Sequence, residues 1–178
     1  MSYTPPLLRT VADRGYVVFR GDHYDLNLVI IRRATDPDDL AAIYRVSGAW
    51  HAEWFRCQSM PTPQYLMEPL NDEGCAILAP GQHRGAWAVG WHKGRPALSQ
   101  TGAPVLVYRD DDRDELPEIT GEPVRGYFGI NVHDPIGYSA GCVTADTSTI
   151  TRLIELVNEQ SRAGFGDSVS LTILDGSR

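Results

Sequence analysis

Proline and glycine set the main limit on how this chain can fold. Its 178 residues include 12 prolines and 17 glycines, which divide the chain into short segments. Most apolar segments between them are short or alternate with polar residues, as β-strands do. This pattern predicts a mainly β fold with one or two helices, arranged as a β-sandwich or an open barrel with a helix packed alongside.

Several of these segments are specific enough to predict individual strands. Residues 26–31 form a near-continuous β-branched run, which predicts a central strand covered on both faces. Residues 40–44 and 50–55 flank Ser47-Gly48 and favour two strands joined by a tight turn, although Asp38-Asp39 could equally cap a helical turn. Further strands are expected within 16–19, 81–100, 103–108 and 168–174.

Helical spacing is clearest near the C-terminus. The apolar residues Ile150, Leu153, Ile154 and Val157 share one helical face, with Thr147 or Ser148 as the expected cap and Gly164 as the stop. A shorter helix is expected over residues 7–14. Four prolines between residues 58 and 80 predict an irregular, ordered loop without long regular structure.

Length and composition predict one domain. A chain of 178 residues with 42% hydrophobic content can bury one sizeable core. We expect residues 1–25 to form an N-terminal extension packed on a single catalytic domain, residues 26–178. The oligomeric state cannot be read from the sequence.

The charge and the apolar runs exclude several partners. The formal net charge is −7, the pI is about 5.1, and the 16 basic residues are scattered, which argues against a nucleic-acid partner. The sequence lacks a run of about 20 apolar residues, so we expect no membrane span. The N-terminal residues do not resemble a secretory signal, so we expect synthesis in the cytoplasm.

We also expect no metal or other cofactor. The three cysteines have unrelated spacings, which supports neither a disulfide framework nor a paired metal site. Asp110, Asp112 and Asp114 begin like a calcium loop, but Glu115 and Gly121 stand where such a loop needs glycine and glutamate. This segment is predicted to be a solvated turn.

The stretch from Gly126 to Asp146 has the composition of a nucleophile and its base. His133 ends an apolar run, and Cys142 follows among small residues. Cysteine attacks as a thiolate, so we expect His133, and the N-terminus of the following helix, to lower the pKa of Cys142. The alternative is that Cys142 is simply a small buried apolar residue.

The segments Asn131-Val132-His133 and Ser139-Ala140-Gly141-Cys142-Val143 together resemble the catalytic signature of L,D-transpeptidase domains. The resemblance implies that Cys142 is the nucleophile and His133 its base. It also implies that backbone N–H groups near Gly141 and Cys142 stabilise the oxyanion, with Ser139 supporting the loop. The residues expected to contact substrate are His92, Gln100, Tyr138 and Ala140.

The implied substrates are peptidoglycan stem peptides, whose acyl group would pass from the enzyme to an amine or to water. The site of action would be the cell wall or periplasm, after delivery or lysis. Two departures from the family pattern concern substrate orientation: Ala140 stands where histidine is common, and Thr144 where arginine or asparagine is common. The alternatives are a non-catalytic wall-binding or phage-tail module with a relic site, and a cytosolic cysteine amidase.

Overall fold

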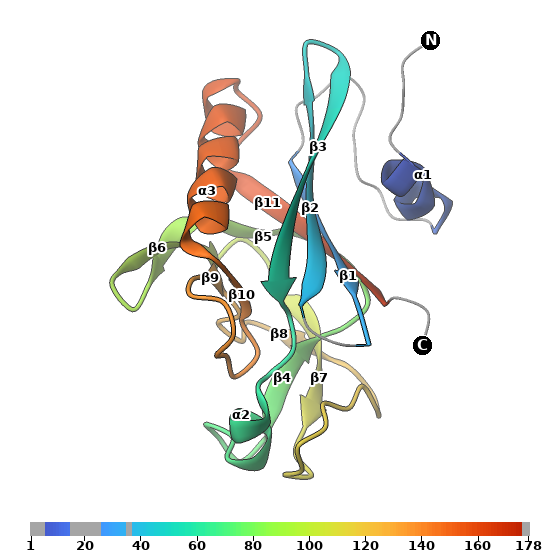
Figure 1. The fold of residues 1–178 in the computed structure, drawn as a ribbon, viewed down its shortest axis with the longest axis vertical. Helices are drawn as coiled ribbons and strands as arrows, with labels where there is room; N and C mark the ends of the chain where they lie inside the picture. The colour runs from blue at the N-terminus through green and yellow to red at the C-terminus, as the bar shows by residue number, and fades with distance from the viewer. Residues whose placement is uncertain (1–5, 15–25, 35–36, 176–178) are drawn as a thin grey trace.

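The computed structural model describes residues 6–14, 26–34 and 37–175. Eight strands form a closed barrel in the order β1-β11-β5-β6-β9-β10-β3-β2, and a separate three-stranded sheet has the order β4-β7-β8. Figure 1 shows α3 alongside the barrel and α1 on the outer side of β1. The strands are β1 (Asn27–Arg32), β2 (Asp38–Val46), β3 (Ala49–Gln58), β4 (Cys75–Leu78), β5 (Gly81–His92), β6 (Arg95–Gln100), β7 (Val105–Asp110), β8 (Val124–Gly126), β9 (Val132–His133), β10 (Val143–Ala145) and β11 (Ser168–Asp175); the helices are α1 (Pro6–Asp13), α2 (Pro63–Met67) and α3 (Thr147–Arg162).

The mainly β prediction is confirmed. The large sheet closes on itself, however, so it is a closed barrel where the sequence predicted a sandwich or an open barrel. Closure depends on the parallel pairing of β1 with β11 and on the very short strands β9 and β10. Strands of two and three residues have no detectable alternation in the sequence, which explains why closure could not be predicted.

The central position predicted for β1 is confirmed, because β1 pairs with β2 on one side and β11 on the other. Its alternate side chains enter two apolar clusters. Leu28 and Ile30 face the main core, whereas Val29 packs in a smaller cluster with Val11 of α1. The described part of the N-terminal extension therefore packs on the barrel. The strand expected at residues 16–19 lies outside the described residues.

Two hairpins of the barrel have the same kind of turn. Ser47-Gly48 joins β2 to β3, and Lys93-Gly94 joins β5 to β6. In each turn the first residue has φ +49° and the glycine has φ +78°. Positive φ at both central residues matches the twist of the flanking strands. Residues 38–46 accordingly form a strand, and the helical alternative for that segment is wrong.

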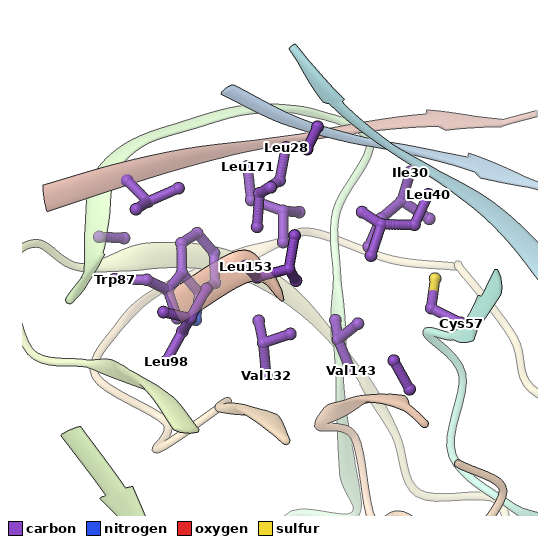
Figure 2. Packing of buried hydrophobic residues seen from close by; sticks show 14 of the residues in the cluster. Leu28, Ile30, Leu40, Cys57, Trp87, Leu98, Val132, Val143, Leu153 and Leu171 are labelled. Carbon is purple, nitrogen blue, oxygen red and sulfur yellow. The ribbon is translucent and has the colours of Figure 1, made fainter. Parts of the chain in front are cut away.

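The C-terminal helix forms as predicted, but a different residue caps it. Asp146 is the N-cap, and its carboxylate accepts the N–H of Thr149, so Thr147 is the first helical residue. Gly164, with φ +86°, follows the helix end. Figure 2 shows Leu153 of this helix in the same cluster as Trp87 and other barrel side chains.

The proline-rich segment is more regular than expected. It contains the short helix α2, which begins at Pro63, and the strand β4, which pairs with β7. Leu78 of β4 and Val107 of β7 belong to the main core, so both sheets share it. None of the helices in the described residues is long and apolar enough to cross a bilayer.

Candidate active site

The alternation of side chains along β9 and β10 determines which residues of these segments point away from the core. Val132 and Val143 are register partners in this parallel pair, and both side chains enter the main core. Figure 2 shows them near each other in that core. Because successive side chains point to opposite faces of a strand, Asn131, His133 and Cys142 are directed away from the core.

Of these three residues, His133 and Cys142 line a cavity of about 450 Å³. Its wall includes seven of the eight residues that the sequence predicted for the site. The exception is Gln100. The predicted residues that line it are His92, His133, Tyr138, Ser139, Ala140, Gly141 and Cys142.

Gly141 is required at its position for two reasons. Its φ is +138°, a backbone conformation that is essentially restricted to glycine, and a Cβ there would lie 2.3 Å from the carbonyl oxygen of Ala76 in β4. The cysteine loop therefore lies directly against the small sheet. A side chain at Gly141 would push Cys142 out of its place in the cavity.

Ser139 holds the same loop by two hydrogen bonds. Its buried hydroxyl accepts the N–H of Gly141 at 3.0 Å and donates to the carbonyl oxygen of Cys142 at 2.8 Å. This agrees with the supporting role expected for Ser139. The Ser139 hydroxyl is the acceptor for the Gly141 N–H. Within the described residues, the Cys142 N–H has no hydrogen-bond acceptor. Of the two N–H groups expected to bind an oxyanion, only that of Cys142 is therefore available.

The thiol of Cys142 is neutral in this arrangement. Its Sγ lies 3.4 Å from the N–H of Asn131, which donates to it, and 3.7 Å from the carbonyl oxygen of Gly129, which can accept the thiol proton. Burial raises the pKa of Cys142, and the Asn131 N–H and the charge of Lys93 only partly offset this effect. The expectation of a lowered Cys142 pKa is wrong, because burial is the largest effect and raises this pKa.

His133 is oriented as a base. Its Nδ1 lies 3.0 Å from the backbone carbonyl oxygen of Asp134. A carbonyl only accepts, so Nδ1 carries the proton and Nε2 is left with its lone pair. The two described residues His133 and Cys142 share no hydrogen bond here.

His92 is held neutral by a chain of hydrogen bonds. The N–H of Gln100 donates to Asn131 Oδ1 at 3.1 Å, which turns the Asn131 amide nitrogen toward His92 Nδ1, at 2.9 Å. An amide nitrogen donates, so Nδ1 of His92 must accept and Nε2 carries the proton. Burial and the charges of His133 and Lys93 lower the pKa of His92, in agreement with this assignment.

Asn131 was absent from the residues expected to act in the site, yet it contacts both Cys142 and His92. One signal could have identified it. Asn131 lies two residues before His133, so the two side chains share a face of the same extended segment. Asn131 belongs to the segment that resembles the family, but no role was predicted for it from the sequence.

Gln100 does not line the cavity, but it holds a segment of the cavity wall. Its buried side-chain oxygen accepts the N–H groups of Phe128 and Ile130, and its amide nitrogen donates to the carbonyl oxygen of Gly126. These contacts hold residues 126–130, part of which lines the cavity. Gln100 is placed to support this wall segment, whereas the sequence predicted substrate contact.

Two other residues named from the sequence have clear structural contacts. Tyr138 lies at the cavity mouth, where its hydroxyl donates to Gln64 Oε1 at 2.6 Å and its ring packs against Tyr65. Thr144 is fully buried, and its hydroxyl accepts the N–H of Gly137 at 3.1 Å. Thr144 therefore holds the turn between β9 and β10 and does not line the cavity.

Metal ligation has no visible basis in the part of the chain that the structure describes, where no three His, Cys, Asp or Glu side chains are grouped around a common point. Asp112 and Asp114 instead accept backbone N–H groups two residues further along, as turn residues do.

Comparisons with protein families, curated proteins and solved structures found no match to this chain.

Proposed function

We propose that this protein is a cysteine-dependent acyl-transfer enzyme of the L,D-transpeptidase or L,D-carboxypeptidase type, acting on peptidoglycan stem peptides. The observation that carries the chemistry is that Cys142 and His133 line one cavity, with Nε2 of His133 free to accept a proton. The choice of substrate is supported by the resemblance of the His133 and Cys142 segments to that family. The site of action we propose is the cell wall.

The neutral resting state defines the first step. As Cys142 Sγ attacks the substrate carbonyl carbon, Nε2 of His133 takes the thiol proton, so the charge pair forms only during attack. The carbonyl oxygen becomes an oxyanion, for which the N–H of Cys142 is the available donor.

Collapse of this intermediate breaks the bond to the leaving amine. The His133 imidazolium donates its proton to that amine, and the acyl group remains on Cys142 as a thioester. In the second half of the reaction, neutral His133 accepts a proton from the incoming amine or water, which attacks the thioester. The thiol recovers the proton when it leaves, so His133 and Cys142 end as they began.

The test is incubation of the protein with purified tetrapeptide muropeptides. We expect new cross-linked or shortened muropeptides, together with a covalent acyl adduct on Cys142 that mass spectrometry can locate. Cys142→Ala should abolish both, and His133→Ala should reduce adduct formation by about 100-fold or more. Muropeptides left unchanged under conditions in which a known enzyme works would contradict the proposal.

A second candidate function is wall binding without turnover. The burial that raises the pKa of Cys142, and the missing hydrogen bond between the Cys142 and His133 side chains, favour it. In that case wild-type protein and Cys142→Ala should bind sacculi equally, and neither should change the muropeptides. Adduct formation on Cys142 would exclude this alternative.

A further inference from the structure

The cavity that contains Cys142 is positively charged although the protein as a whole is negative. The chain has 23 acidic and 16 basic residues. The charged residues among the described ones that line the cavity are Lys93 and Arg109, and no Asp or Glu is among them. Because a cleft lined by one sign of charge concentrates ligands of the opposite sign, this cavity favours an anionic ligand.

Of the two cations, Lys93 has fewer contacts with other side chains. It is the only lysine in the chain, and it occupies the turn between β5 and β6, next to His92. No ion pair joins Lys93 to another residue in the described ranges. Its charge also lowers the pKa of Cys142, which means that the field of the ammonium group reaches the reacting sulfur.

Arg109 already contacts several groups of the cavity wall. Its guanidinium lies over the ring of Phe128, 4.9 Å from the ring centroid, and donates to the carbonyl oxygen of Gly74 at 3.2 Å. It also forms an ion pair of 2.9 Å with Glu73, whose side chain is 75% exposed. These contacts fix Arg109 in the wall and neutralise part of its charge, so Lys93 remains available for a ligand.

We propose that Lys93 is a specificity-determining residue that binds a carboxylate of the acyl donor close to the carbonyl attacked by Cys142. A lysine ammonium is a compact point charge on a flexible stem, which suits a single carboxylate whose position varies with the bound peptide. That the carboxylate belongs to a stem peptide rests on the proposed function. The preference of the cavity for a carboxylate does not depend on the proposed function.

Two alkylating reagents test this preference directly. Iodoacetate carries a carboxylate and iodoacetamide is neutral, and both react with the same Cys142 thiolate, so the ratio of their rates does not depend on the Cys142 pKa. We expect this ratio to be higher in the folded protein than in the protein denatured in urea. Lys93→Gln should lower it by about two- to fivefold, which is the factor an exposed ion pair contributes.

Two further variants control for folding and for net charge. Lys93→Arg should retain the wild-type ratio because it keeps the charge. Arg162→Gln removes a positive charge at the exposed end of α3, outside the cavity, and should also leave the ratio unchanged. An equal ratio in wild type and Lys93→Gln would overturn the inference, as would an equal drop in Arg162→Gln.

The muropeptide assay separates this inference from the proposed function. If Lys93→Gln lowers the alkylation ratio but wild-type protein leaves muropeptides unchanged, the carboxylate site stands and the proposed function fails. If wild-type protein converts muropeptides and Lys93→Gln does so with the same KM, the function stands and the role of Lys93 in donor binding fails.

Discussion

The imidazole rings of His92 and His133 lie face to face, with 3.9 Å between their centroids and 12° between their planes. Two cationic rings at this distance would repel each other strongly, so at most one of them is charged at a time. Asn131 assigns the neutral role to His92 by donating to its Nδ1. In the proposed reaction, His133 is therefore the ring that accepts the proton.

Replacing Asn131 with aspartate should reverse this assignment. In Asn131→Asp a carboxylate faces Nδ1 of His92 and favours the protonated ring, so the pKa of His92 should rise by about one unit or more. The charged ring then opposes protonation of His133, and acylation of Cys142 should slow. The ¹H–¹⁵N NMR signals of the imidazoles, followed against pH, measure this shift.

Asn158→Asp is the matched control, because residue 158 is exposed on α3 and does not line the cavity. It adds the same charge and should leave the His92 titration in place. A His92 pKa that is unchanged in Asn131→Asp would contradict the hydrogen-bond chain described above.

The pH dependence of Cys142 alkylation should follow its burial. Because burial raises the pKa of Cys142, the thiolate fraction at neutral pH is smaller than for a free thiol, and the rate should keep rising at pH values where a free thiol has levelled off. The measurement is the rate of iodoacetamide labelling of Cys142 between pH 6 and 10, at about half-unit steps. The same thiol in urea is the reference, and a native midpoint below the urea midpoint would disprove this prediction.

The glycine at position 141 should be less replaceable than the one at 137. In both Gly141→Ala and Gly137→Ala a non-glycine residue takes a positive φ, +138° or +110°, at a cost of about 1–3 kcal/mol. Only Gly141→Ala also forces a Cβ against Ala76, which adds about 1–3 kcal/mol, whereas the Cβ at 137 meets its nearest atom at 3.9 Å. Urea unfolding should show the larger loss for Gly141→Ala, and equal losses would rule out the close approach to β4.

Gln160 does not line the cavity, but it should be important for stability. Its buried amide accepts the N–H of Leu26 and donates to the carbonyl oxygens of Gly166 and Ser168, so it ties α3 to the starts of β1 and β11. Gln160→Ala leaves these buried groups unpaired and should lower the free energy of unfolding by about 1–3 kcal/mol or more. The exposed Asn158→Ala should change it by less than about 0.5 kcal/mol, and a similar small effect at Gln160 would contradict the prediction.

The segments with a clear alternating or helical pattern were predictable because such patterns are local. Alternation and β-branching identify β1, the hairpin of β2 and β3, and β11, and helical spacing identifies α3. The short helix α2 and the strand β4 were not predictable, because the density of prolines in that segment hid them. The predicted cap of α3, Thr147 or Ser148, lies one or two residues after the actual cap, since Asp146, Thr147 and Ser148 are all suitable capping residues.

The sequence by itself determined the mainly β class and the main helix, because residue types at fixed spacing carry that information, and it named Cys142 and His133, which line one cavity. Only the tertiary structure decided the closed barrel and the contacts of the site. The short parallel pair of β9 and β10 brings Asn131 to the sulfur, and the small sheet brings Ala76 against Gly141. The tertiary structure also decided the direction in which the Cys142 pKa shifts, because burial of the thiol depends on packing between distant segments, and no local pattern records it.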